Sequence, residues 1–140
     1  MEINFKDYLD VLKENLDSYD GKYEKIIDYS PELFKLLTDI LNEKIISSES
    51  RLKISAALGY FVAPFDIIPE EIYGPDGYVD DLYIVAYVLM DITSEYGYDF
   101  LDDLWDNDEK LIEVIEECYT KSKEILGDKT SFVLSYIGLN

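Results

Sequence analysis

The stretch YFVAPFDIIPEEIYGPDGYVDD, residues 60–81, separates two apolar segments of the chain. Three of the four prolines fall within it, together with a concentration of acidic side chains. A proline fixes its own φ angle and restricts the residue before it, so this connection is stiffer than an ordinary loop. We therefore expect it to determine how the two flanking segments meet.

Both flanking segments have the periodicity of helices. The spacing of their apolar residues predicts one helix over residues 50–63 and another over residues 78–96. On the first of these, Ser55, Gly59 and Ala63 recur at intervals of four beside Ala56. Such a face of small side chains would let another helix approach closely.

The rest of the chain also follows helical spacing. Residues 5–19 place apolar side chains at i, i+3, i+4 and i+7, and a second helix should begin at Ser30 as N-cap with Pro31 in its first turn. A later helix should start after Asp106, with Glu109 completing a capping box, and a short last helix fits residues 128–137.

No alternating strand pattern and no internal repeat is present. The sequence therefore predicts a single all-α domain over residues 1–140, with five or six helices. Amphipathic helices would surround a central apolar helical hairpin, whose two arms are joined by the loop rich in proline and aspartate.

Charge limits the classes of partner. The net charge is −19, from 31 acidic and 12 basic residues. Nucleic-acid binding and electrostatic adhesion to anionic lipid both require basic side chains, so neither is expected. A basic protein partner remains open.

Residue content also limits the chemistry. The chain has no histidine and a single cysteine, Cys118, on an apolar helical stripe, so no Ser/His or Cys/His pair can form and a buried, inert thiol is expected. The start of the sequence is acidic and amphipathic, unlike a secretion signal. The apolar run over residues 82–90 would give about 13 Å of helix against the roughly 30 Å of a bilayer core. We expect a cytoplasmic protein without a membrane span.

Neighbouring aspartates begin the predicted helix over residues 78–96. Helical phase places Asp80 on a polar stripe with Tyr83 and Tyr87, and places Asp81 above Ile84 on the apolar face. Asp81 rather than Asp80 is therefore expected to point inward, where its carboxylate needs hydrogen-bond donors or a cation.

The segment from Ala56 to Leu89 resembles the YkvA or DUF1232 family, a domain of unknown function. The family pattern is an apolar helix, then Pro-x-Asp-x-Ile-Pro-Asp, then Gly-x-x-Asp-Asp before a second apolar helix, and the family-like core covers residues 52–92. The motif positions are occupied here by Pro64, Asp66, Ile68, Pro69, Gly77, Asp80 and Asp81. Glu70 stands where the family has an aspartate after the second proline. The resemblance implies a fold and a set of positions, but no reaction.

Two interpretations of the acidic motif residues remain open. In one, the aspartates cap helices and turns, and no cofactor is expected. In the other, Asp66, Asp80, Asp81 and Glu70 are oxygen ligands for Mg²⁺, Ca²⁺ or Mn²⁺, and a metal-activated water hydrolyses a phosphoester. The many tyrosines near the loop have the same ambiguity, because they suit either a recognition surface or internal hydrogen bonds to the aspartates.

The sequence thus favours a cytoplasmic, non-catalytic interaction or scaffold module with an unidentified protein partner. The alternative is the carboxylate-based metal site, with phosphoester hydrolase activity. A second alternative is an acidic protein that imitates the charge of nucleic acid and binds a basic partner.

Overall fold

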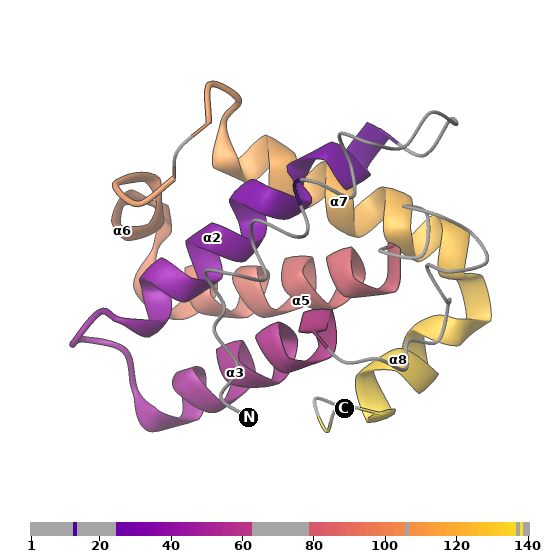
Figure 1. Cartoon of the computed structure of the whole chain (residues 1–140), viewed down its shortest axis with the longest axis horizontal. Helices are drawn as coiled ribbons and strands as arrows, with labels where there is room; N and C mark the ends of the chain where they lie inside the picture. Colours follow the sequence, from indigo (N-terminus) through magenta and orange to yellow (C-terminus); the bar gives the residue numbers. More distant parts are fainter. Residues whose placement is uncertain (1–12, 14–24, 63–78, 106, 137, 139–140) are drawn as a thin grey trace.

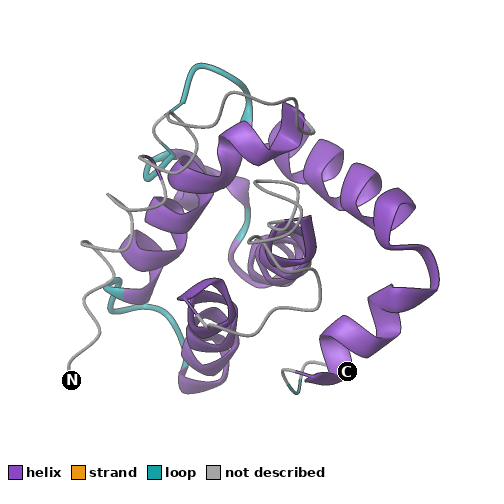
Figure 2. Cartoon of the chain, turned by 45° about the vertical axis from the view of Figure 1, so that its right-hand side comes forward, coloured by secondary structure: helices purple, strands orange, loops and turns teal. Residues whose placement is uncertain are grey.

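The computed structural model describes residue 13 and residues 25–62, 79–105, 107–136 and 138. Its helices are η1 (Lys25–Tyr29), α2 (Ser30–Leu41), α3 (Ser48–Val62), α5 (Val79–Tyr96), α6 (Tyr98–Asp102), α7 (Leu111–Leu126), η3 (Gly127–Lys129) and α8 (Thr130–Tyr136). All regular structure in these ranges is helical, as Figure 2 shows, so the predicted all-α fold is confirmed. The helix predicted over residues 5–19 lies outside the described residues.

Helix α5 forms the centre of the described structure. It runs between α3 and α7, while α2 and α8 also pack against it (Figure 1). Every residue from Val79 to Leu89 except Tyr87 is buried. A helix that is apolar around most of its circumference is stable only inside a protein, which accounts for this position. Its most extensive packing is with α7, so α5 alone occupies the centre and α3 is a flanking helix.

The beginning of α2 differs in one detail from the expectation. Pro31 lies in the first turn, as predicted, but the N-cap is Tyr29 and no side-chain capping bond forms there. Ser30 is buried at the first helical position, so its predicted role as N-cap is wrong. The other end of α2 is held from α3, where the guanidinium of Arg51 donates to the carbonyl oxygen of Leu41.

Helix α7 starts later than the sequence predicts, and Asp106 of the predicted capping box lies outside the described residues. This helix begins at Leu111 after Lys110, and no side chain caps it. The turn before it is organised differently, because the indole N–H of Trp105 donates to the carbonyl of Glu109 at 2.8 Å. The predicted end of the helix is confirmed at Gly127, whose φ of 55° suits a residue without Cβ.

The small-residue face of α3 is not a helix contact in the described structure. Ser55 and Gly59 are exposed, and a Cβ built on Gly59 would meet nothing within 4 Å. The expected close approach of another helix is therefore wrong at Ser55 and Gly59, and Ala63, the last position of the predicted face, lies outside the described residues. Helix α3 packs against α5 and α2, and its buried side chains include Ile54 and Leu58.

Among the described helices, none is long and apolar enough to cross a bilayer. This finding agrees with the short apolar runs of the sequence.

Candidate functional site

The two adjacent motif aspartates lie in the first turn of α5, and both are buried. The exposed fraction is 0% for Asp80 and 1% for Asp81. The inward direction predicted for Asp81 is confirmed, whereas the outer position predicted for Asp80 is wrong. The polar stripe does reach the surface farther along α5, where Asp91 is partly exposed and Ser94 is exposed. Its first turn is buried and accepts a hydrogen bond from Tyr60 of α3.

A line of polar contacts joins α3 to α5 and positions this turn. The bonds run along the two helices in opposite chain directions, which makes the helices antiparallel. They are Ser50 Oγ to Glu95 Oε2 at 3.2 Å, Lys53 Nζ to Asp91 Oδ2 at 2.8 Å, and Tyr60 Oη to Asp80 Oδ2 at 2.6 Å. The last of these lies inside the protein, so the motif turn of α5 is attached to the final part of α3 by a buried bond.

The carboxylate of Asp80 receives a hydrogen bond on each oxygen from the chain itself. The hydroxyl of Tyr60, itself 3% exposed, donates to Oδ2, and the backbone N–H of Asp81 donates to Oδ1 at 3.0 Å. A length of 2.6 Å is typical of a hydroxyl that donates to an ionised carboxylate. The position at the start of α5 also favours negative charge through the helix dipole. Asp80 therefore has the contacts that a buried structural carboxylate requires.

Tyrosines on the next turns extend the packing toward α7. The rings of Tyr83 and Tyr119 stack with centroids 5.6 Å apart, and the ammonium of Lys123 lies 5.5 Å from the Tyr119 centroid. Burial, followed by the influence of Tyr119, raises the pKa of the Tyr83 hydroxyl above its usual value. For these two tyrosines the internal packing interpretation fits better than an open recognition surface, because the exposed fraction of Tyr83 is 3%.

The other predicted site residues lie outside the described residues. These are Pro64, Asp66, Ile68, Pro69, Glu70 and Gly77. Within the described ranges, no group of three or more acidic or cysteine side chains has a geometry that could hold a metal ion. The structure thus places Asp80 and Asp81 together in one turn and leaves the proposed four-residue metal set as a hypothesis.

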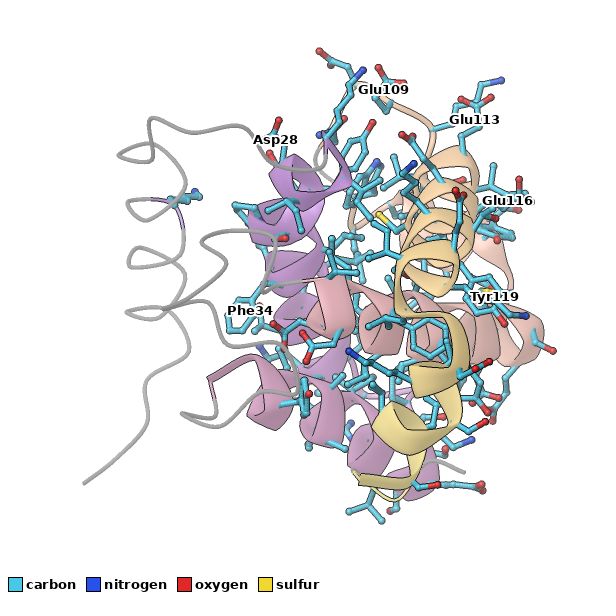
Figure 3. The ribbon with its side chains drawn as sticks, turned by 90° about the vertical axis from the view of Figure 1, so that its right-hand side faces the viewer. Asp28, Phe34, Glu109, Glu113, Glu116 and Tyr119 are labelled. Carbon is cyan, nitrogen blue, oxygen red and sulfur yellow. The ribbon has the colours of Figure 1, made fainter. Side chains whose placement is uncertain are left out.

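An acidic hollow on the outer face of α7 was not singled out from the sequence. It has a volume of about 430 Å³ and is lined by Glu113, Glu116, Glu117, Thr120, Lys121 and Glu124. Figure 3 shows Glu113 and Glu116 on the outer side of α7. The sequence signal was the i, i+3, i+4 and i+11 spacing of the glutamates, which places them on one helix face.

The inner face of α7 carries the single cysteine. Cys118 is fully buried, as predicted. Burial, with a smaller contribution from Glu117, raises the pKa of its thiol from 9.0 to about 12. A thiol with so high a pKa is a poor nucleophile at neutral pH, which agrees with an inert core residue.

The fold and the motif together define a class: a small all-α protein in which two antiparallel helices meet at a buried Tyr–Asp bond beside an acidic motif. The family model described as "Protein of unknown function (DUF1232)" matches residues 50–87. The chain is also similar to "Uncharacterized protein ORF9" of Methanothermobacter thermautotrophicus, with 38% identity over 130 residues that cover 93% of this chain and 89% of that protein. The chain belongs to the DUF1232 family. No solved structure matches it.

The region matched by the family model includes both helices that the buried Tyr60–Asp80 bond joins. Residues 50–87 contain α3 from Ser50 onward and the first half of α5. Both partners of the buried bond, Tyr60 and Asp80, therefore lie within the matched region. The sequence-based assignment to DUF1232 is confirmed, with boundaries close to those inferred from the motif, whereas the name YkvA is not tested by this match.

Proposed function

We propose that this chain is a non-catalytic cytoplasmic module that acts by binding another protein, and that its family motif serves to hold α3 and α5 in a fixed arrangement. The single observation that carries the proposal is the environment of Asp80. Its two carboxylate oxygens accept hydrogen bonds from Tyr60 and from the Asp81 backbone, and its exposed fraction is 0%. A carboxylate used in this way stabilises the fold rather than contacting a substrate.

Composition supports the remaining parts of this proposal. The lack of histidine removes the commonest general base, and a single buried cysteine fits a reducing compartment. A module without a reaction of its own acts through its surface, so its partner is a macromolecule.

If the protein is instead a metal-dependent hydrolase, Asp80 should be needed for turnover rather than for stability. We expect purified protein to show no hydrolysis of bis(p-nitrophenyl) phosphate above the rate with Mn²⁺ alone, and we expect Asp80→Asn to lower the free energy of unfolding. Turnover that disappears in Asp80→Asn, with the stability of that variant unchanged, would establish a metal-dependent site and refute the structural role.

A second candidate function is supported by the acidic hollow of α7. The side chains of Glu113, Glu117 and Lys121 form one row at intervals of four, and Glu116, Thr120 and Glu124 form a second. The groove between two such rows is where a ridge of another helix packs. With four glutamates and one lysine, the hollow would accept a basic helix, in agreement with an acidic protein that imitates nucleic-acid charge.

Binding measured at different ionic strengths, and with variants that replace glutamate by glutamine, tests this candidate. A helical peptide rich in lysine should bind the protein at low ionic strength, more weakly as salt screens the charges. Glu113→Gln combined with Glu117→Gln should weaken this binding, whereas Asp99→Asn on α6 should have less effect. Binding that is equally strong at high salt, or equal in all three proteins, would exclude the α7 hollow as the site.

A further inference from the structure

The outer face of α3 combines an exposed apolar side chain with an open glycine. Leu52 is 72% exposed, the most exposed of the large apolar residues in the described structure. Gly59, seven residues later, is exposed and has open space where a Cβ would lie. Seven residues are two helical turns, so the two positions share one face of α3, about 10 Å apart. Figure 1 shows α3 at an edge of the described helices.

This face is uncharged over its whole length. Ser48, Leu52, Ser55 and Gly59 follow one another at intervals of four, three and four, and all four are exposed. This spacing is that of a seam between two packed helices. Helical phase places the adjacent acid, Glu49, beside this row rather than on it. Its carboxylate lies 3.8 Å from the ammonium of Lys53, which also pairs with Asp91 at 2.8 Å. A protein with a net charge of −19 repels copies of itself elsewhere, so a neutral face is where a second copy can approach.

We propose that the outer face of α3 is a self-association surface, on which a second copy of this chain packs its own α3 antiparallel to the first. A two-fold axis between Leu52 and Gly59 places each leucine over the glycine of the other copy. The protruding side chain and the open position thus complement each other twice in the same contact, as an interface between identical surfaces requires. The small side chain of Ser55, between them, allows the helices to lie close together.

The contact is small, so the dimer is weak. A stable interface buries roughly 800 Å² on each partner, more than one face of a 15-residue helix offers. Because the seam is uncharged while both copies are strongly acidic, salt should screen the repulsion and strengthen the association. An interface held by ion pairs would respond in the opposite direction.

Sedimentation equilibrium of the full chain, from micromolar to millimolar concentration and at low and high salt, measures this association. We expect a monomer–dimer equilibrium that shifts toward dimer as salt is raised. Leu52→Gln should raise the dissociation constant about tenfold or more, since it removes buried apolar contact from both halves of the interface. Gly59→Leu should raise it by a similar factor, because its side chain fills the position that Leu52 of the other copy would occupy. Neither change should unfold the protein, because Leu52 is exposed and the space at Gly59 is open.

A matched control lies on another helix. Ile112 on α7 is 40% exposed, so Ile112→Gln removes a similar apolar side chain from a different surface and should leave the dissociation constant unchanged. A dimer that Ile112→Gln weakens as much as Leu52→Gln, or that neither α3 variant affects, would overturn the proposal.

Disulfide trapping tests the antiparallel register. Protein with Leu52→Cys mixed with protein with Gly59→Cys should form a mixed disulfide under mild oxidation, whereas either variant alone should form much less. The native Cys118 does not compete, because it is fully buried. Equal trapping of all combinations would refute the register. A protein that stays monomeric under every condition, or whose Leu52-dependent binding is instead to phosphatidylcholine vesicles or to another protein, would refute a second copy as the occupant.

Discussion

Removal of the Tyr60 hydroxyl isolates the bond on which the motif geometry depends. Tyr60→Phe keeps the ring and removes the hydroxyl that donates to Asp80 Oδ2. Both residues are at most 3% exposed, so water cannot readily replace that donor. A hydrogen bond to a charged group contributes about 1.5–3 kcal/mol, and we expect Tyr60→Phe to cost about 2 kcal/mol of unfolding free energy.

Urea unfolding followed by circular dichroism measures this loss. For a chain of 140 residues it corresponds to a melting temperature lower by about 6–8 °C. The matched control is Tyr87→Phe on α5, because Tyr87 is only partly buried and its hydroxyl forms no hydrogen bond within the described ranges. This control should change stability by less than about 0.5 kcal/mol.

A double-mutant cycle assigns the effect to the pair. Tyr60→Phe and Asp80→Asn together should cost less than the sum of the two single changes, by about 1 kcal/mol or more. A loss in Tyr60→Phe no larger than that in Tyr87→Phe, or additive effects in the cycle, would refute the reasoning that the bond stabilises the contact between α3 and α5.

Three further changes test other parts of the structure. Asp81→Ala should cost about 1–3 kcal/mol in urea unfolding, since Asp81 is 1% exposed and its contacts are buried; a neutral result would contradict this. Arg51→Lys should cost about 1 kcal/mol by the same measurement, because lysine cannot bond the carbonyls of Leu41 and Glu43 together as the guanidinium does; full stability would exclude this link. Finally, the folded pKa of Cys118 is raised to about 12, so the unfolded thiol ionises first as pH rises above 9.0. Stability should therefore be complete below pH 9.0 and fall by up to about 1.4 kcal/mol per unit above it, and a pH series with Cys118→Ala should lack this part of the slope.

Strong local signals were sufficient to predict most of the helices. Pro31 and Gly127 mark ends that the structure confirms, and the apolar period located α3, α5 and α7 within a few residues. The short helix α6 was not predicted. Gly97, with a φ of 85°, separates the end of α5 from the start of α6 at Tyr98. In a helix of five residues, the spacing of apolar side chains is too short to distinguish the helix from a loop.

The site was predicted less completely, for a physical reason. Helical phase gives the direction of a side chain but not its partners in the fold, and Asp80 is bonded by Tyr60, twenty residues away in sequence. The same limitation applies to α3, whose face at Ser55 and Gly59 looked suited to a neighbouring helix but is exposed. In both cases, burial or exposure depends on how segments distant in sequence pack together.

The central claim is that Asp80 is a structural residue whose oxygens are occupied by the chain itself. Thermal melting of the wild-type protein and of Asp80→Asn, first with chelator and then with Mg²⁺, Ca²⁺ or Mn²⁺, tests it most directly, because a ligand that binds only the folded state raises its stability. We expect the variant to melt at a lower temperature than the wild type, with no change in either melting temperature on addition of any of the three cations. A cation that stabilises the wild type but not Asp80→Asn would contradict the claim and identify Asp80 as a metal ligand.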